Sequence, residues 1–296
     1  MKTNTVIIGS GIAGMTAAIY LKRANIDFII IEKGAPGGQI LRTSTIENYP
    51  GFNKIDGPEF AMNVYKQLNE LNVNYIFDDV KEISNNNEKI LIKTQNSEIV
   101  CENIIIATGR NPRKIGLDNE DKYIGKGISY CALCDGNLYK DKNVAIIGGG
   151  NSAFEEALYL SKICKKVTLI SRNTVFKADE IIVDRVKETN NIDIKAGVNV
   201  SKIIGNDKVE QIELTSLEKL DIDALFLYIG QEPNTEMLKN LEITDESGYI
   251  IVNEFMETKA KNIYACGDVI LKNTYQIITA ASEGAVAANQ IIKKES

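Results

Sequence analysis

The chain has 296 residues, of which 25% are charged and 44% are apolar, as in an ordinary globular protein long enough for two domains. Its net charge of −6 and pI near 5.1 argue against general binding to nucleic acid or to an anionic membrane surface. The sequence contains no histidine, which excludes a Ser-His-Asp triad, a Cys-His pair and an imidazole metal site.

The N-terminal residues run directly into a short apolar strand, so no secretory signal is expected. No apolar run approaches the roughly 18 to 20 residues that cross a bilayer, and we expect a cytoplasmic protein without a membrane segment. Among the cysteines, Cys131 and Cys134 form a CxxC pair, whereas Cys101, Cys164 and Cys266 stand alone in apolar surroundings and should be buried. A single CxxC without histidine predicts no metal site.

The first predicted element is an apolar strand that passes through a glycine-rich turn into a helix, over residues 6–21. An apolar strand at 28–31 follows, which completes the βαβ unit that places a pyrophosphate on a helix N-terminus. The same pattern recurs over residues 145–160, followed by a strand at 167–170. Two such turns, each between a strand and a helix, are a more specific signal than one GxGxxG alone.

The first copy ends its second strand with Glu32. A carboxylate at this place accepts hydrogen bonds from a ribose diol, so the adenosine part of FAD is predicted at the turn. The glycines of that turn are Gly9, Gly11 and Gly14.

The second copy has Ser171 where the first has Glu32. The stretch that follows holds only Arg172 and Lys177 as cations, which is a poor clamp for the 2′-phosphate of NADPH. The residues that correspond to the first turn are Gly148, Gly150 and Ala153.

Residues 131–136 read Cys-Ala-Leu-Cys-Asp-Gly. Two thiols separated by two residues can close a small reducible disulfide, and a nearby dinucleotide fold can supply it with electrons. Because histidine is absent, proton transfer must fall to Asp, Glu, Lys, Tyr or Cys. The combination predicts flavin-linked disulfide chemistry.

With these motifs the chain resembles, from end to end, the low-molecular-weight flavoprotein thioredoxin reductases. The resemblance implies an α/β fold of two Rossmann-like, three-layer dinucleotide-binding domains. It places the FAD-binding domain at residues 1–112 plus 240–296, and an inserted NAD(P)-type domain carrying the redox CxxC at 113–239, with a two-stranded hinge near Pro112 and Pro233. Further matching motifs are Gly37-Gly38-Gln39, residues 47–51, Ala107-Thr108-Gly109, residues 230–234, residues 265–268, Gln276 and residues 279–281.

The resemblance also implies roles for the site residues. Cys134 should face the flavin, Cys131 should exchange with thioredoxin, and Asp135 should act as acid and base. The family is typically homodimeric, which we carry over as an expectation. The FAD-binding residues that it implies are Gly9, Gly11, Ala13, Gly14, Glu32, Gly38, Gln39, Asn48, Thr108, Gly109, Gly267, Asp268, Gln276 and Ile277.

The chain departs from the family pattern in two places. The usual His-Arg-Arg is here residues 171–173, Ser-Arg-Asn, and the usual Arg before the flavin-side Gln is Tyr275. In both respects it looks similar to the ferredoxin-dependent flavin thioredoxin reductases, a branch that has lost a working NADPH site. We therefore expect reduced ferredoxin as the electron donor. The alternatives are NADPH-dependent thioredoxin reduction, reduction of another disulfide with a pyridine nucleotide, and a non-enzymatic flavin redox sensor.

A ferredoxin donor predicts a basic docking patch, because ferredoxins are usually acidic. Weak nucleotide binding or ferredoxin docking would involve Gly148, Gly150, Ala153, Arg172 and Lys177. Further candidates are Lys162, Lys165 and Lys166 on the second domain, and Arg110, Arg113 and Lys114 near the hinge.

Overall fold

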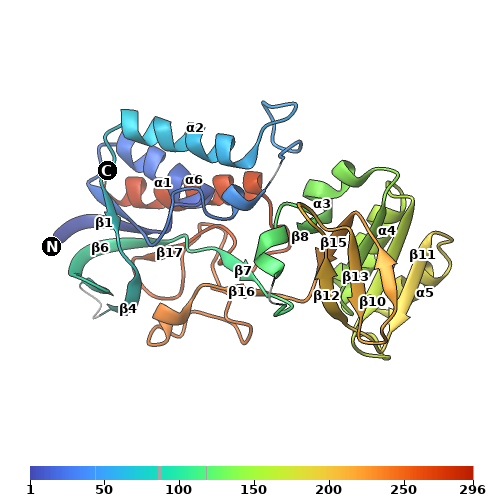
Figure 1. Cartoon of the computed structure of the whole chain (residues 1–296). Helices are drawn as coiled ribbons and strands as arrows, with labels where there is room; N and C mark the ends of the chain where they lie inside the picture. The colour runs from blue at the N-terminus through green and yellow to red at the C-terminus, as the bar shows by residue number, and fades with distance from the viewer. Residues whose placement is uncertain (44, 86–88, 118, 296) are drawn as a thin grey trace.

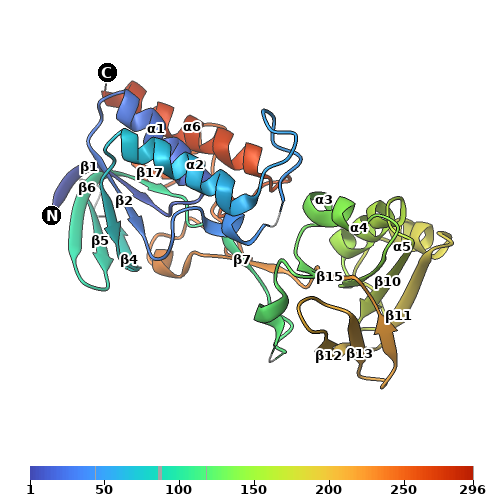
Figure 2. The same ribbon diagram turned by 45° about the horizontal axis from the view of Figure 1, so that its top comes forward.

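The computed structural model describes residues 1–43, 45–85, 89–117 and 119–295. Two α/β bodies lie side by side and are joined by a pair of short strands (Figures 1 and 2). The chain builds most of the first body, crosses to the second, and returns to complete the first with β17 and the C-terminal helix α6. The expected α/β fold of two dinucleotide-binding domains, one inserted in the other, is confirmed.

The first body contains a seven-stranded sheet in the order β3-β2-β1-β6-β5-β4, with β17 paired to β6. The pairs made by β1 and the pair of β17 with β6 are parallel, whereas β4, β5 and β6 form an antiparallel meander. Its strands are β1 (Lys2–Ile8), β2 (Phe28–Glu32), β3 (Tyr75–Phe77), β4 (Val80–Asn85), β5 (Ile90–Thr94), β6 (Glu98–Ile106) and β17 (Ile263–Ala265).

Three helices cover one face of this sheet: α1 (Ile12–Arg23), α2 (Gly57–Glu70) and α6 (Ile277–Glu295) (Figure 2). Alternate residues of the central strands point to opposite faces. Ile7 therefore packs in the core under the helices, while Val6 and Ile8 pack in a second core on the other face. Burial on both faces explains why these strands are continuous runs of Val and Ile.

The second body contains a five-stranded parallel sheet in the order β11-β10-β9-β15-β8. Helices pack on one face, and a three-stranded antiparallel sheet packs on the other. The parallel strands are β8 (Ile128–Ser129), β9 (Asn143–Ile147), β10 (Lys166–Ser171), β11 (Ile192–Ala196) and β15 (Ala224–Leu227). The helices are α3 (Ala132–Asp135), α4 (Asn151–Ser161) and α5 (Glu180–Lys187), and the antiparallel strands are β12 (Val200–Ile204), β13 (Gln211–Leu214) and β14 (Lys219–Asp221).

The two connections between the bodies pair with each other. Strands β7 (Arg110–Pro112) and β16 (Gln231–Pro233) are antiparallel, with Asn111 opposite Glu232. Short 3₁₀ turns complete the chain at η1 (Gly38–Arg42), η2 (Glu120–Tyr123), η3 (Gly136–Tyr139) and η4 (Glu236–Leu238).

The solitary cysteines and the helices bear on two expectations about the whole chain. Cys101, Cys164 and Cys266 are buried free thiols, as predicted from their apolar surroundings. Among the helices described, none combines the length and the apolar character that crossing a bilayer requires.

Candidate functional site

The first glycine-rich turn joins β1 to α1 and is very tight. A Cβ added to Gly14 would lie 2.0 Å from the carbonyl oxygen of Gly9, so only glycine fits this crossing. Glu32 holds the turn from the end of β2. Its carboxylate accepts hydrogen bonds from the backbone N–H of Ser10 at 2.6 Å and of Gly34 at 2.8 Å. The residue predicted to bind ribose therefore also fixes the turn.

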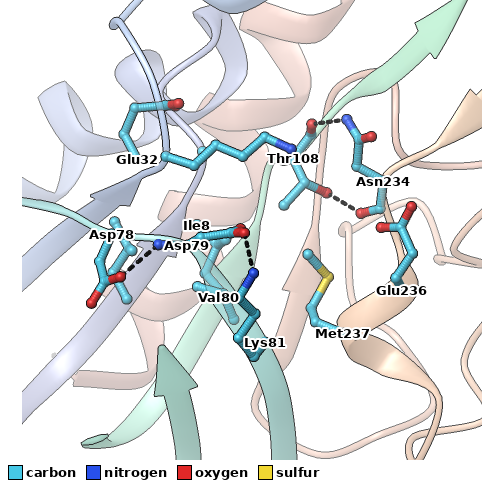
Figure 3. A pocket seen from close by; sticks show the side chains of 13 residues that line it. Ile8, Glu32, Asp78, Asp79, Val80, Lys81, Thr108, Asn234, Glu236 and Met237 are labelled. Carbon is cyan, nitrogen blue, oxygen red and sulfur yellow. Dashed lines mark hydrogen bonds and ion pairs between the residues drawn. The ribbon is translucent and has the colours of Figure 1, made fainter. Parts of the chain in front are cut away.

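A cavity of about 350 Å³ opens beside this turn (Figure 3). The predicted residues Gly9, Glu32 and Thr108 line it together with side chains from β4 and from the segment after β16. Asn234 was not among the predicted site residues. It closes one wall through a pair of bonds, from Thr108 Oγ1 to the Asn234 carbonyl at 2.7 Å and from Asn234 Nδ2 to the Thr108 carbonyl at 2.8 Å (Figure 3). Asn234 is the last residue of the motif at residues 230–234, so the motif could have identified it as a site residue.

Three residues predicted on the flavin side come from distant parts of the sequence. Asn48 Nδ2 donates to Gln276 Oε1 at 3.1 Å, which brings a loop after η1 against the start of α6. Gln39 donates through Nε2 to the carbonyl of Arg110. Ile277 is the first residue of α6.

Arg110 packs against Tyr275 and Asp268, two contacts that were not predicted from the sequence. Its guanidinium lies 3.6 Å from the centre of the Tyr275 ring, and its Nε is 3.8 Å from Asp268 Oδ2. Lys272 approaches the other carboxylate oxygen of Asp268 at 3.4 Å. Arg110 Nε and Asp268 Oδ1 are nevertheless buried without a hydrogen-bond partner among the described residues. Unsatisfied buried polar atoms of this kind point to a polar group that completes the site.

The basic residues near the hinge are therefore poor candidates for a docking patch. Arg110 is largely enclosed by Tyr275 and Asp268, contrary to the surface position that the prediction required. The next two cations are each paired, Arg113 with Glu232 at 2.8 Å and Lys114 with Asp121 at 2.6 Å.

The residues around the first turn fit FAD. Gly11 is the N-cap of helix α1 and provides no side-chain cap, and a Cβ at Gly11 or Gly109 would meet no atom within 4 Å. Open backbone N–H groups at such a helix end suit a pyrophosphate. Gly38 lies against Gly11, and Ala13 lies under Gly267. The unsatisfied atoms of Arg110 and Asp268 would serve the polar chain of the cofactor.

The CxxC pair lies at the carboxyl end of β8, on the side of the second body that faces the first (Figures 1 and 2). Cys131 and Cys134 form a disulfide, and Cys131 is the N-cap of α3. The backbone N–H of Cys134 donates to Cys131 Sγ at 3.1 Å. This contact gives a thiolate at Cys131 one hydrogen-bond donor.

Asp135 follows the disulfide and is held by a residue that sequence analysis missed. Ser129 Oγ donates to Asp135 Oδ2 at 2.6 Å, while Oδ1 is buried without a partner among the described residues. Burial raises the pKa of Asp135, although the bond from Ser129 lowers it. A carboxyl group with a raised pKa that directly follows the disulfide in the chain can hold and deliver a proton.

The second glycine-rich turn lies at the same sheet edge as the disulfide. Gly150 is the N-cap of helix α4 and provides no side-chain cap, and a Cβ on Gly150 would meet no atom within 4 Å. Ser171 Oγ donates to the Asn173 carbonyl, and the N–H of Lys177 donates to Gly149, so residues 171–177 fold over the turn. Ala153 lies against Gly148.

Arg172 and Lys177 are both exposed on this segment. Neither forms an ion pair with the residues that the structure describes, which leaves two cations for a phosphate group. Within the same described ranges no cluster of three or more His, Cys, Asp or Glu residues could hold a metal ion.

Comparison with known proteins assigns the family. The sequence profile described as pyridine nucleotide-disulphide oxidoreductase matches residues 3–285. A thioredoxin reductase from Mycoplasma genitalium is 40% identical over 293 residues, which cover 97% of this chain and 93% of the relative. The crystal structure of thioredoxin reductase from Streptococcus pyogenes, also 40% identical, superposes with a TM-score of 0.95 over 100% of this chain and 99% of that one.

The expected membership in the ferredoxin-dependent branch receives no support from these comparisons. A ferredoxin-flavin thioredoxin reductase from Clostridium acetobutylicum is 29% identical, with a TM-score of 0.55 over 99% of this chain and 98% of that one. Both values are lower than those for the S. pyogenes enzyme. The chain belongs to the thioredoxin reductase family of pyridine nucleotide-disulphide oxidoreductases, whose members are FAD flavoproteins.

Proposed function

We propose that the chain reduces the disulfide of thioredoxin with electrons from NADPH, which pass through FAD and the Cys131–Cys134 pair. The observation that carries this proposal is a disulfide, Cys131–Cys134, that the buried carboxyl group of Asp135 follows directly in the chain. A redox sensor needs no acid next to its thiols, so this arrangement favours a catalytic cycle with substrate turnover.

The chain's own residues account for the proton and sulfur chemistry. FAD, when bound, accepts a hydride and supplies electrons to a disulfide. Reduction of the Cys131–Cys134 bond gives two thiols, and Asp135 exchanges the protons that the sulfur atoms gain and lose. Cys131 as thiolate then attacks the partner disulfide, forming a mixed disulfide and releasing one partner sulfur as a thiol after protonation. Cys134 displaces the second partner sulfur and restores the starting bond.

NADPH is proposed over ferredoxin for two reasons. The pyridine nucleotide family profile spans both glycine-rich turns, and the second turn retains an open helix N-terminus with two free cations near it. The loss of one Arg at Asn173 weakens the 2′-phosphate contact without removing it, since a charge-assisted bond contributes roughly 1.5 to 3 kcal/mol. Ferredoxin is the second candidate because of residues 171–173 and Tyr275.

Domain rotation is part of the proposal. A disulfide held against the flavin cannot also face a second protein, so the inserted domain must turn between the two transfers. We assign residues 1–112 and 240–296 to the FAD-binding domain and 113–239 to the rotating domain. The paired strands β7 and β16 support this division, because they are short and lie between the two bodies.

The test is an anaerobic titration of the FAD-loaded protein with NADPH, NADH and reduced ferredoxin, following the visible flavin absorbance. We expect NADPH to bleach the flavin at low stoichiometry, and thioredoxin to restore the colour. If reduced ferredoxin bleaches the flavin and NADPH does not, ferredoxin is the electron donor and the proposal of NADPH is wrong. If NADPH bleaches the flavin fully but thioredoxin is not reduced, NADPH stands as the electron donor and the proposed substrate is contradicted.

A further inference from the structure

Tyr228 lies between the second glycine-rich turn and the redox disulfide. It directly follows β15, the strand between β8 and β9 in the sheet, so its position is the same carboxyl edge from which both sites emerge. Its backbone contacts the turn, since a Cβ on Gly148 would lie 2.7 Å from the Tyr228 carbonyl oxygen. Its hydroxyl reaches the disulfide helix and accepts a hydrogen bond from the N–H of Ala132 at 2.7 Å.

The hydroxyl of Tyr228 donates a hydrogen bond to the carboxylate of Glu156 on α4. Burial raises the pKa of Tyr228 far above its ordinary value, and the charge of Glu156 raises it further. The hydroxyl therefore stays protonated at any working pH, donating to Glu156 and accepting from Ala132. The nearest charged groups are Glu156 on α4 and Asp135 at the end of α3, with Glu155 beside Glu156.

We propose that Tyr228, held by Glu156, is a positioning residue for the redox disulfide. Its hydroxyl occupies the first N–H of α3 and places a carboxylate charge one hydrogen bond away from the helix that carries both sulfur atoms. Ala132 is fully buried, so its N–H has no water to bind in place of Tyr228. With this donor occupied, Cys134 N–H is the donor that reaches Cys131 Sγ.

The arrangement opposes the thiolate form of the pair. A thiolate is stabilised by nearby N–H donors and destabilised by nearby negative charge. Tyr228 ties the first N–H of α3 to its hydroxyl, and Glu156 contributes one negative charge through that hydroxyl. The consequence is a stronger reductant, because a pair whose reduced form is less stable transfers its electrons more readily to a partner disulfide. This inference deepens the proposed function, since it concerns the same Cys131–Cys134 pair.

The test equilibrates the anaerobic, FAD-loaded protein with mixtures of reduced and oxidised dithiothreitol, then counts alkylated thiols by mass. Dithiothreitol is oxidised to its cyclic disulfide as the Cys131–Cys134 bond gains two electrons and two protons. We expect Glu156→Gln to shift the equilibrium about tenfold toward the dithiol, which corresponds to about 30 mV for this couple. Tyr228→Phe should shift it in the same direction, and the alkylation rate should show a lower thiol pKa in both.

The control is Glu155→Gln, which makes the same charge change at the exposed neighbouring position and should shift the equilibrium less than twofold. Because Glu156 acts through Tyr228, its substitution should add little in the Tyr228→Phe background. Equal shifts from the two Glu variants, or additive shifts in the double variant, would overturn the proposal. A wild-type pair that dithiothreitol cannot reduce would instead refute the proposed function, and this inference with it.

Discussion

Glu32 satisfies two requirements with one carboxylate. It accepts two backbone N–H groups that shape the first turn, and it lines the cavity beside that turn. In the second copy the hydroxyl of its counterpart, Ser171, exchanges hydrogen bonds with the backbone of Asn173. The two copies thus differ at the end of their second strand, and the sequence alone reveals this difference because a carboxylate at a strand end is a local feature.

Replacing Glu32 with Gln should weaken FAD binding about 10- to 100-fold. The amide oxygen can replace one charge-assisted acceptor but not both, and each such bond contributes roughly 1.5 to 3 kcal/mol. Reconstitution of the apoprotein, followed by the quenching of flavin fluorescence, measures the change. Glu70→Gln, an exposed change on α2, is the control. Unchanged affinity in the Glu32 variant would show that its carboxylate serves neither the turn nor the cofactor.

Replacing Asp135 with Asn should lower thioredoxin-dependent turnover about 100-fold, since general acid–base groups contribute roughly 10² to 10⁴. Burial raises the pKa of Asp135, so the protonated acid persists to higher pH and wild-type activity should fall as the pH rises through that value. The variant should lack this decline. Steady-state rates across the pH range report both effects, with the exposed Asp207→Asn as the control.

The same substitution predicts the sign of a stability change. A carboxyl group whose pKa is raised on folding contributes stability below its unfolded pKa and loses that contribution as the pH rises through the folded value. Above its folded pKa the ionised Asp135 therefore opposes folding, and Asp135→Asn should raise the melting temperature at high pH more than at low pH. A lower melting temperature of the variant at high pH would show that the Ser129 bond outweighs the cost of burial.

At the scale of elements, the regular units were predictable and the contacts between them were not. The strands and helices around both glycine-rich turns lie within a few residues of the predicted ranges, because apolar runs and turn glycines are local signals. The prediction of Arg110 as a surface cation was wrong, because Tyr275 and Asp268 enclose it only after the chain has returned from the second body. The bond between Ala132 and Tyr228 was missed because it joins two residues of the second body that are 96 positions apart in the sequence.

The crossing of α1 and α6 provides a test at this scale. A Cβ on Gly284 would lie 2.1 Å from the carbonyl oxygen of Ala13, so the helices touch through their backbones. Gly284→Ala should lower the free energy of unfolding by about 2 to 4 kcal/mol, despite the better helix propensity of alanine. Denaturant unfolding monitors the change, and Ser282→Ala on the exposed side of α6 is the control. A stabilised Gly284→Ala variant would contradict this packing.

At the scale of the whole molecule, the two bodies approach each other beyond the hinge. A Cβ on Gly125 of the second body would lie 3.6 Å from the carbonyl oxygen of Arg42 in η1. This contact holds the two bodies in their present arrangement. A rotation of the inserted domain has to separate the two residues.

A cross-link at this contact should stop turnover while preserving the transfer between flavin and disulfide. Arg42→Cys with Lys126→Cys offers two exposed positions for a short bismaleimide. With dithionite as reductant, electrons should still reach the Cys131–Cys134 pair, whereas NADPH-driven reduction of thioredoxin should fall at least tenfold. Each single variant treated with the reagent is the control. Undiminished turnover of the cross-linked protein would contradict the rotation.

The burial of the three solitary cysteines determines which thiols of the protein an oxidant can attack. Burial raises the pKa of Cys101 to about 12 and that of Cys164 to about 11, and it also raises the pKa of Cys266, so all three persist as unreactive thiols. A peroxide in solution therefore meets reactive sulfur only at Cys131 and Cys134 among the cysteines. Mild oxidation of the Cys131 and Cys134 thiols regenerates the resting disulfide. The next transfer of electrons to this disulfide restores the two thiols, so no separate repair enzyme is required.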